Sequence, residues 1–397
     1  MNVNTADICN PKHTAFFKAK SEKVIFYGGS GSGKSYSVCD RIAIAIYYHK
    51  KPLKIVVIRK TMPSLKKTCI DLLQQRFALF GLPFNLNRQD NIARTTYGAQ
   101  IIFISINNFV DIDKVKSLTD VSYIWVEEAS EISLAAYEEI DRRLRGDMIK
   151  NPQIFLSFNP VGKHSWLYKL FWEMNLPCDK IQVNVYSNKW ATQKYIDKLE
   201  ALKTYNYNLW LIYCQGEFGS LEDVIFQKYT VVDKAPDNYD ESILGLDFGF
   251  NVATALVRLY IKEQSIYVEE LIYDTGMTNS DLIKEIRSLK IDRNECIYAD
   301  SAEPDRIQEI CEAGFNCYPA DKEDKQYGIN FVKALDISVL SESVNVLKEI
   351  DSYCWQKDKD GNVIDKPTKF MDHAMDAMVY AARTHMTGFT PEVVYVK

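Results

Sequence analysis

Short apolar runs alternate with helix-like stretches between about residues 20 and 160. Each run is bulky and of the length of a buried strand; in order they read VIFY, KIVVIR, QIIFISI, YIWVEE and QIFLSFNP. The stretch after the first run, SYSVCDRIAIAIYYH, is mainly apolar and helix-like. Alternation of this kind predicts a parallel sheet whose strands are joined by crossover helices.

The pattern changes between residues 163 and 237. Two segments dense in aromatic residues, HSWLYKLFWEM and NYNLWLIYCQGEF, flank an amphipathic stretch, ATQKYIDKLEALKTY. They predict a small helical lid. The chain is then rich in Gly, Pro, Asp and Asn up to a boundary near residue 238. This composition favours a linker there.

Strand-like runs return after residue 238. ILGLDFGF, TALVRLYIK and SIYVEELIYD predict three successive strands, and TNSDLIKEIRSL predicts a helix. Next come ECIYAD as a strand, EPDRIQEICEAG as a helix, NCYPA and SVNVL as two further strands, and HAMDAMVYAARTH as a closing helix. This order is the ribonuclease-H-like arrangement, so we expect a second α/β domain.

Composition adds limits to this picture. The chain has 397 residues, of which 47% are apolar and 25% charged, as in a globular protein with two domains. It contains neither a run of eighteen apolar residues nor a secretion-like N-terminal segment, and its nine cysteines form no C-x-x-C pair. We expect a cytosolic protein with reduced thiols. The net charge of −5 argues weakly against a protein that coats nucleic acid, but it leaves room for a local basic channel.

The clearest chemical motif lies in FYGGSGSGKSYS, residues 26–37. Gly28, four free positions and then Gly33, Lys34 and Ser35 have the spacing that wraps backbone N–H groups around a nucleoside triphosphate. A strand before the loop and a helix after it are the required context, and a glycine-rich turn without a ligand fits these flanks poorly. We expect ATP to be bound by Gly28, Gly29, Ser30, Gly31, Ser32, Gly33, Lys34 and Ser35, the last of which also binds Mg²⁺.

Two later strand ends supply the other groups that ATP hydrolysis needs. Glu127 and Glu128 end YIWVEE; we expect Glu127 to hold Mg²⁺ and Glu128 to act as the base that polarises water. Without the glycine loop, an acidic strand end at the surface would be the simpler interpretation. Asn159, in the next strand end, is placed to sense the γ-phosphate.

Charge that develops on the γ-phosphate also requires a cation. EIDRRLRGD offers Arg142, Arg143 and Arg145, although arginines at the end of a helix are explained equally well by the helix dipole. Arg59, after IVVI, is a further candidate without a clear role.

Three aspartates and a histidine stand out in the second half. Asp247 ends ILGLD and Asp300 ends CIYAD, while Asp376 lies on the closing helix with His373 three residues before it on the same face. Each aspartate alone would be interpreted as a cap or a solvated strand end. Their joint order predicts a site for two Mg²⁺ or Mn²⁺ ions that cuts phosphodiesters.

Taken in order, these motifs resemble a known family, the large terminase subunit of tailed bacteriophages, and in particular the type found in defective Bacillus prophages. The resemblance covers about residues 20 to 385 and is carried by GGSGSGKSY, IRKTMPSLKKT, KVKSLTDVSYIWVEEASEIS, RRLRG, FNP, GEFG, GLDFGF, YADSAEPDRI and DHAMDAMVYA. It implies an ATP-driven DNA-packaging motor with a C-terminal endonuclease.

The changes of pattern along the chain give its division, and the resemblance implies its site residues. We expect a P-loop ATPase core at 1–162, a helical lid and linker at 163–237, and a ribonuclease-H-like nuclease domain at 238–397. ATPase residues would be Gly28 to Ser35, Glu127 and Glu128, with a coupling motif at Ser157 to Pro160; nuclease ligands would be Asp247, Asp300 and Asp376, beside His373.

The partners that the resemblance implies are double-stranded DNA, a small terminase subunit and the portal ring of the procapsid, on which the chain would form a ring. It would work in the cytoplasm of the bacterial host and would not enter the mature virion. The family's loop often has an arginine where this chain has Ser30, which moves our expectation for the catalytic cation to Arg143 or Arg145 acting across subunits. The family also tends to have Asn where this chain has Asp372, which leaves the metal preference open.

Two other interpretations remain at this point. One is a P-loop DNA-dependent ATPase of the helicase or recombination type with an inactive nuclease-like domain. The other is a scaffold that holds nucleotide without turnover, which would not need Glu128.

Overall fold

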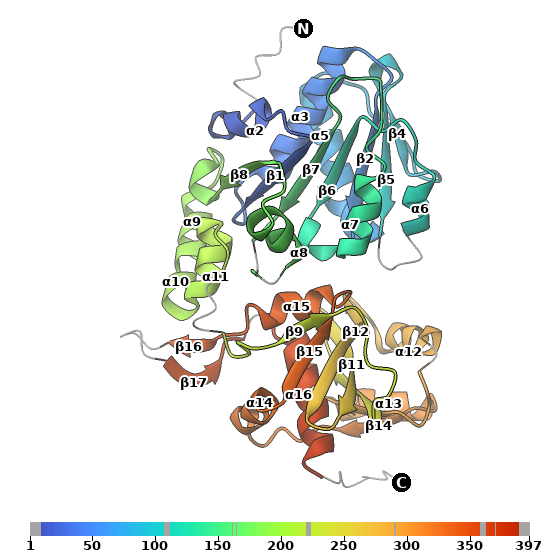
Figure 1. Cartoon of the computed structure of the whole chain (residues 1–397), viewed down its shortest axis with the longest axis vertical. Helices are drawn as coiled ribbons and strands as arrows, with labels where there is room; N and C mark the ends of the chain where they lie inside the picture. Colours follow the sequence, from blue (N-terminus) through green and yellow to red (C-terminus); the bar gives the residue numbers. More distant parts are fainter. Residues whose placement is uncertain are drawn as a thin grey trace. The chain divides into compact units, whose positions relative to one another are not determined.

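The computed structural model describes residues 9–106, 112–160, 162–163, 165–219, 224–289, 291–357, 363–369 and 371–388. The chain divides into two compact units (Figure 1). The first comprises Met1–Lys203 and Tyr207–Gly219, and the second comprises Thr204–Asn206 and Ser220–Lys397. The expected three-part division at residues 162 and 237 stays a prediction. Part of KDKDGNVIDKPTK, a stretch that suits either a basic hairpin or a solvated turn, lies outside the described residues, which omit 358–362.

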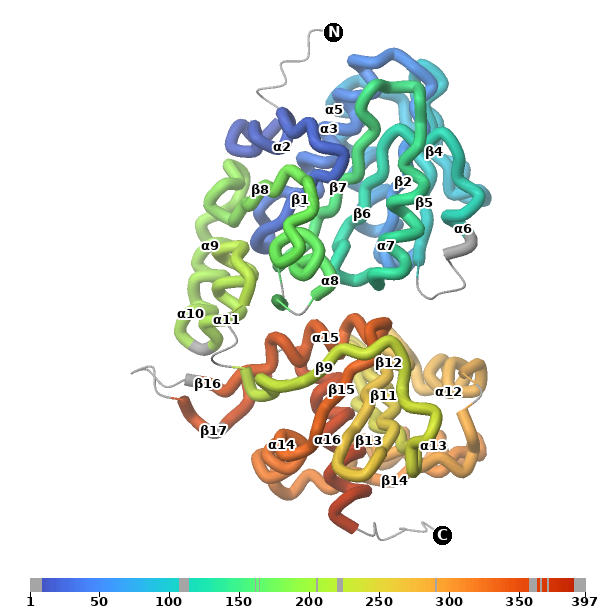
Figure 2. The backbone as a smooth tube through the Cα atoms, in the orientation of Figure 1, coloured from blue at the N-terminus to red at the C-terminus, as the bar shows by residue number. Residues whose placement is uncertain are grey.

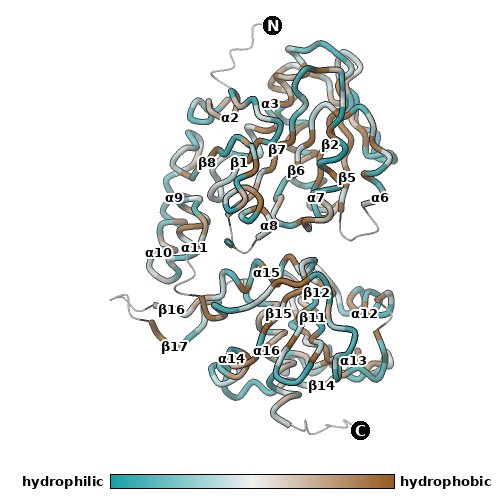
Figure 3. Tube along the Cα trace, in the orientation of Figure 1, coloured by the Kyte–Doolittle hydropathy of each residue, from teal (hydrophilic) through white to brown (hydrophobic). Residues whose placement is uncertain are grey.

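The first unit is built on an 8-stranded sheet with the order β3-β4-β5-β2-β6-β7-β1-β8. Its strands are β1 (Lys23–Gly28), β2 (Lys54–Arg59), β3 (Asn85–Asn87), β4 (Ile92–Arg94), β5 (Gln100–Ser105), β6 (Tyr123–Glu127), β7 (Gln153–Phe158) and β8 (Asp179–Val183). The five predicted apolar runs are confirmed as the strands β1, β2, β5, β6 and β7, which pair in parallel. In Figure 3 these strands are largely brown, in keeping with their burial on both faces of the sheet.

Helices and short 3-10 or π turns precede, connect and follow these strands, and the tube in Figure 2 traces their path. They are η1 (Pro11–His13), α2 (Thr14–Lys18), α3 (Lys34–His49), α4 (Met62–Leu65), η2 (Lys66–Ile70), α5 (Asp71–Leu79), η3 (Thr96–Gly98), α6 (Ile112–Lys116), η5 (Ala129–Glu131), α7 (Leu134–Asp141), α8 (Trp166–Tyr168), η6 (Lys169–Glu173), η7 (Val185–Ser187), α9 (Gln193–Glu200), α10 (Leu202–Tyr205), α11 (Tyr207–Trp210) and η8 (Leu211–Gln215). The stretch expected to be a helical lid is helical in large part, but it also contributes β8, which pairs in parallel with β1.

The second unit contains a 7-stranded sheet with the order β14-β13-β10-β11-β12-β15-β9. Its strands are β9 (Thr230–Val232), β10 (Glu241–Asp247), β11 (Ala253–Lys262), β12 (Ser265–Thr275), β13 (Cys296–Ala299), β14 (Asn316–Pro319) and β15 (Asp336–Leu340), and β16 (Trp355–Lys357) pairs separately with β17 (Val363–Pro367). Its helices are α12 (Asn279–Ser288), α13 (Pro304–Glu312), α14 (Lys325–Lys333), α15 (Val344–Ile350) and α16 (His373–Met386). The predicted ribonuclease-H-like order of strands and helices is present, with β10, β11 and β12 antiparallel and β13 parallel to β10.

One prediction of secondary structure in this unit is wrong. SVNVL was expected to form a strand, yet it opens helix α15, and the neighbouring strand is β15. The helix begins here because the Glu270 carboxylate, on β12, accepts hydrogen bonds from the backbone N–H groups of Asn345 (2.6 Å) and Val346 (3.1 Å). A distant carboxylate thus satisfies the first turn of the helix, and the β-branched residues do not decide its conformation.

Helix α16 packs directly onto β10 at Gly245. A Cβ atom added to Gly245 would lie 1.9 Å from the carbonyl oxygen of Ala377, so only glycine allows the helix this close to the strand. The buried face of α16 carries small side chains, which allow close packing. Its fully buried alanines are Ala374, Ala377, Ala381 and Ala382. This close packing fixes the height of α16 above the end of β10.

We therefore expect Gly245→Ala to destabilise the second unit by about 3 kcal/mol, because the added methyl group overpacks the helix–strand contact. Differential scanning calorimetry of the full chain measures this loss. Gly276→Ala is the matched control: Gly276 has a φ of +77°, and an added Cβ would meet no described atom within 4 Å, so backbone strain alone should cost about 1 kcal/mol. Equal losses in the two variants would contradict the packing explanation.

Candidate functional site

The loop between β1 and α3 borders a cavity of about 460 Å³ in the first unit. Two of its backbone N–H groups donate hydrogen bonds to the chain that follows β7: that of Gly29 to the carbonyl oxygen of Val183 (3.1 Å) and that of Ser30 to the carbonyl oxygen of Tyr213 (2.8 Å). Gly33 has a φ of +87°, which favours glycine at the start of the helix. The loop therefore follows the expected strand–loop–helix path and is tied to residues of the predicted lid.

Lys34 lies at the base of the loop. Its ammonium group donates hydrogen bonds to the carbonyl oxygens of Gly28 and Gly29, both at 2.8 Å, and to Oδ1 of Asn159 at 3.0 Å. Burial lowers the pKa of Lys34 to about 8, although Glu128 and Glu127 act in the opposite direction. The structure thus brings together the loop lysine and the strand-end asparagine that the sequence singled out separately.

Glu127 joins three elements at the end of β6. One carboxylate oxygen accepts a hydrogen bond from the Ser35 hydroxyl on α3, and the other accepts one from the Ser157 hydroxyl on β7. Trp125 Nε1 donates to the same Ser157 oxygen at 2.8 Å. Burial raises the pKa of Glu127, and the nearby Glu128 adds to this effect, while both hydroxyl groups oppose it.

Glu128 lines the same cavity from an unusual backbone conformation. Its φ is +51°, in the left-handed region that residues other than glycine rarely adopt. Such local strain is a recurrent property of functional positions. A cavity with glycine-loop backbone, a lysine, a hydroxyl and two carboxylates has the donor set that a nucleoside triphosphate with Mg²⁺ requires, so the residues present fit this ligand.

The sequence did not reveal every residue of this cavity. Asn188 donates a hydrogen bond from Nδ2 to the carbonyl oxygen of Gly31 at 2.8 Å, yet nothing in the sequence links it to the loop. Arg59 and Lys67 also line the cavity. The Arg59 guanidinium donates to the Thr68 hydroxyl at 2.7 Å, and its charge acts on Glu127, so the arginine without a clear role belongs to this cavity.

The structure does not bring the other arginines to this loop. Arg143 forms an ion pair with Glu139 on α7 and donates a hydrogen bond to the carbonyl oxygen of Lys116 at 3.1 Å. Arg145 is exposed. Neither is among the described residues that line the cavity.

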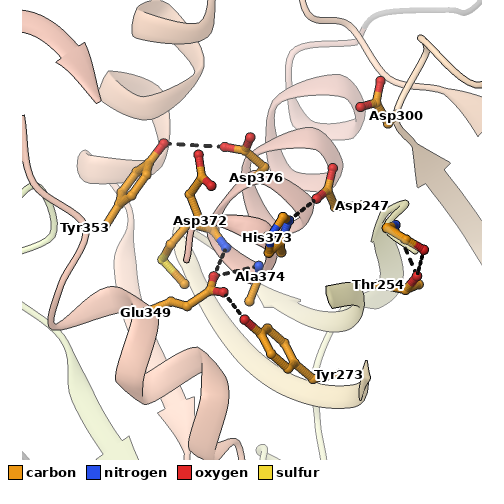
Figure 4. A network of polar contacts seen from close by, with 12 residues as sticks. Asp247, Thr254, Tyr273, Asp300, Glu349, Tyr353, Asp372, His373, Ala374 and Asp376 are labelled. Atoms are coloured by element: carbon orange, nitrogen blue, oxygen red, sulfur yellow. Dashed lines mark hydrogen bonds and ion pairs between the residues drawn. The ribbon is translucent and has the colours of Figure 1, made fainter. Parts of the chain in front are cut away.

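In the second unit, the three predicted aspartates come from three elements that meet at one place (Figure 4). Parallel pairing sets Leu246 of β10 beside Ala299 of β13, so Asp247 and Asp300 leave the sheet at the same edge. Asp376 lies in the first turn of α16. His373 Nδ1 is 2.8 Å from Oδ2 of Asp247.

Burial and mutual repulsion dominate the electrostatics of this cluster. Burial raises the pKa of Asp247, and Asp300 and Asp372 add to this effect, whereas the hydrogen bond with His373 lowers it. Burial raises the pKa of Asp376 to about 6 despite the opposing charge of Lys325. The hydrogen bond with Asp247 raises the pKa of His373.

Carboxylate oxygens have the chemistry that Mg²⁺ and Mn²⁺ prefer, so the donor set fits these ions. As the side chains are placed, however, no three His, Cys, Asp or Glu side chains among the described residues lie close enough together to hold one ion. Two of the predicted ligands instead contact lysines: Lys322 Nζ lies 2.5 Å from Asp300 Oδ1, and Lys325 Nζ lies 2.6 Å from Asp376 Oδ1.

A buried glutamate supports the helix that carries part of this cluster. Glu349, on α15, is fully buried and accepts hydrogen bonds from the backbone N–H groups of Ala374 (2.7 Å) and Met375 (3.1 Å), at the start of α16. The Tyr273 hydroxyl donates to its other oxygen at 2.6 Å (Figure 4). Glu349 therefore holds the N-terminus of the helix that bears His373, a role for which the sequence holds no local signal.

Comparisons with known proteins agree on one family. Residues 20–217 match the model of the phage terminase large subunit, and residues 247–383 match the model of the terminase RNase-H-like domain. The PBSX phage terminase large subunit of Bacillus subtilis (strain 168) is 27% identical over 389 residues, which cover 89% of this chain and 88% of that protein. The terminase large subunit of Bacillus phage SPP1 is 24% identical over 396 residues, which cover 93% and 92% of the two chains.

A solved structure shows the same fold. The large terminase of a thermophilic bacteriophage has a TM-score of 0.51 and 17% identity to this chain, and the match covers 94% of this chain and 97% of that one. None of the described helices is long and apolar enough to cross a membrane.

The pKa of Glu349 makes a prediction about stability. Burial raises this pKa from an ordinary value of 4.5 to about 7, so the folded protein binds the proton more tightly than the unfolded chain. The group therefore adds stability below pH 4.5, and this contribution is lost as the pH rises through about 7. Because Glu349→Gln cannot titrate, we expect the wild type to lose stability relative to this variant between about pH 5 and pH 7, as measured by urea unfolding.

The matched control is Glu342→Gln, an exposed position that should leave the pH dependence of the wild type unchanged. Parallel stability curves for the wild type and Glu349→Gln would show that the buried carboxylate does not titrate in this range.

Proposed function

The chain belongs to the phage terminase large subunits, which are DNA-packaging ATPases and nucleases, and we propose how its residues divide this work. ATP binds in the cavity of the first unit, and its hydrolysis drives double-stranded DNA into the procapsid. The aspartate cluster of the second unit cuts the concatemer. The observation that carries the proposal is the convergence of Lys34 and Ser35 of α3, Glu127 of β6 and Asn159 after β7 on one cavity.

In the ATPase reaction each residue has a distinct task. The Lys34 ammonium, which contacts carbonyl oxygens of the loop, would bind the β- and γ-phosphates, and Ser35 and Glu127 would hold Mg²⁺. The ion supplies positive charge that neutralises the phosphate oxygens. Glu128 accepts the proton of the attacking water, and Asn159 connects the γ-phosphate position with the Lys34 ammonium.

In the nuclease reaction Asp247, Asp300 and Asp376 would hold Mg²⁺ or Mn²⁺. When bound, such ions would supply the positive charge that phosphodiester cleavage requires. His373 is oriented by its contact with Asp247, and Glu349 fixes the helix that places His373 and Asp376.

Membership of the family supports the partners that we propose: a small terminase subunit, the portal ring and double-stranded DNA. In a ring on the portal, an arginine of one subunit would reach the nucleotide of the next. Arg145 suits this task better than Arg143, because it is exposed while Arg143 is held by Glu139. The helicase or recombination alternative and the nucleotide-holding scaffold lose their support, since both family models are terminase models.

Lys34→Ala and Asp247→Asn test the division of work in the full chain. We expect Lys34→Ala to lower ATP turnover at least about a hundredfold, because phosphate charge loses its cation, while plasmid cleavage with Mn²⁺ persists. We expect Asp247→Asn to do the reverse. Lys194→Ala and Asp305→Asn, at exposed helical positions, are matched controls. Loss of both activities in either folded variant would contradict two separate sites.

Mixed rings test the arginine. We expect Arg145→Ala to lower ATP turnover about a thousandfold in the complex with portal and DNA, because an arginine supplied in trans stabilises the transition state. Mixing Arg145→Ala with Lys34→Ala subunits should restore part of the turnover, since an intact loop meets an intact arginine wherever the two kinds of subunit are neighbours in the right order. Arg142→Ala is the control. Unchanged turnover in Arg145→Ala, or no restoration on mixing, would rule out this arginine as a trans-acting group.

A further inference from the structure

We propose that Lys322 and Lys325 are resident counterions of the nuclease carboxylates, and that divalent ions bind there by displacing both ammonium groups. The inference rests on the proposed nuclease function and adds a way in which metal binding at that site is regulated. It means that the two lysines lower the affinity of the cluster for metal, because each ion pair has to be broken before the ion binds.

The contacts are direct. Lys322 Nζ lies 2.5 Å from Asp300 Oδ1, and Lys325 Nζ lies 2.6 Å from Oδ1 and 2.7 Å from Oδ2 of Asp376. Lys325 Nζ is also 3.7 Å from Asp372 Oδ2. Both oxygens of Asp376 are therefore engaged by one ammonium group, so they are not free to bind a divalent ion at the same time.

The backbone that carries the lysines is firmly anchored. We call Asp321–Lys325 the lysine segment. Arg383, on α16 and only 6% exposed, lies 2.8 Å from Asp321 Oδ2 and donates to the carbonyl oxygen of Asp324 at 2.5 Å. The Thr384 hydroxyl accepts a hydrogen bond from the Asp321 N–H at 3.0 Å. The same helix that carries Asp376 thus fixes the segment that carries its counterion.

The lysine side chains themselves remain partly in solvent. The side chain of Lys322 is 33% exposed and that of Lys325 is 35% exposed, whereas those of Asp300 and Asp376 are 18% and 15% exposed. An ammonium group on a flexible stem can therefore move into water while its carboxylate stays in place. This asymmetry allows exchange without rearrangement of the fold.

The cluster requires compensation for its negative charge. Asp247, Asp300, Asp372 and Asp376 all act on Tyr380, whose pKa is raised first by burial and then by these four carboxylates. The Lys322 ammonium lies 5.2 Å from the centre of the Tyr380 ring, so it sits above the same group. Neighbouring negative charges disfavour ionisation of each carboxyl group unless cations are present. Lysine and metal are alternative cations for the same oxygens, and their mutual repulsion prevents both from binding at once.

The test measures Mn²⁺ binding by the full chain in the absence of nucleotide and DNA. Electron paramagnetic resonance monitors the concentration of free Mn²⁺. We compare the wild type, Lys322→Gln, Lys325→Gln and the double variant. We expect the double variant to bind Mn²⁺ about three- to tenfold more tightly, because no ion pair has to be broken first. Half-maximal plasmid cleavage should shift to lower Mn²⁺ concentration by a similar factor.

Three controls separate the possible results. Lys325→Arg keeps the charge and should stay near the wild type, and Lys333→Gln, exposed at the far end of α14, should have no effect. Asp247→Asn identifies the part of the Mn²⁺ binding that belongs to this cluster. Circular dichroism confirms that each variant is folded.

Unchanged Mn²⁺ affinity in the double variant would overturn the proposal, because the ammonium groups would then not compete. Weaker affinity would also overturn it, since the lysines would then organise the carboxylates for metal. Wild-type protein that shows no Mn²⁺ binding sensitive to Asp247→Asn would overturn the proposed nuclease site itself, which distinguishes that failure from failure of the exchange.

Discussion

Buried carboxylate charge has to be compensated, and this requirement connects the elements of both units. An uncompensated charge in a protein interior costs several kcal/mol. Glu127 is compensated by hydroxyl groups from α3 and β7, Asp247 by His373 of α16, and Glu349 by Tyr273 and the first N–H groups of α16. In each case the donor comes from another part of the chain. The charged groups thereby fix how strands and helices meet at the two sites.

Parallel strand pairing provides the second constraint. The strands β1, β6 and β7 end at one edge of the first sheet, which places the glycine loop, Glu127 and Asn159 together although 125 residues separate Lys34 from Asn159. In the second unit the pairing of β10 with β13 does the same for Asp247 and Asp300. Helix α16, held close by Gly245, then delivers Asp376. Sheet topology therefore brings the residues of both sites together, and side-chain contacts then orient them.

These topological features explain how much the sequence could predict. Strand ends that carry Glu127, Asp247 and Asp300 are visible as apolar runs followed by a carboxylate, and the glycine loop has a fixed spacing. Asn188, Glu349 and Lys322 could not be found in this way, because each reaches its site through a tertiary contact and has no local pattern. SVNVL was assigned to a strand because its valines favour one, and only the distant Glu270 shows why a helix begins there.

The hydrogen bonds of the loop to Val183 and Tyr213 have a mechanical consequence. Gly29 and Ser30 donate to these carbonyl oxygens, and Asn188 reaches back to Gly31, so residues 183–213 hold the loop at three successive positions. Three hydrogen bonds at consecutive residues allow the loop little movement relative to residues 183–213. A change in the loop that accompanies nucleotide turnover must either stretch all three bonds together or carry the attached segment with it. Displacement of the loop therefore acts directly on Val183, Asn188 and Tyr213, in the chain that follows β7.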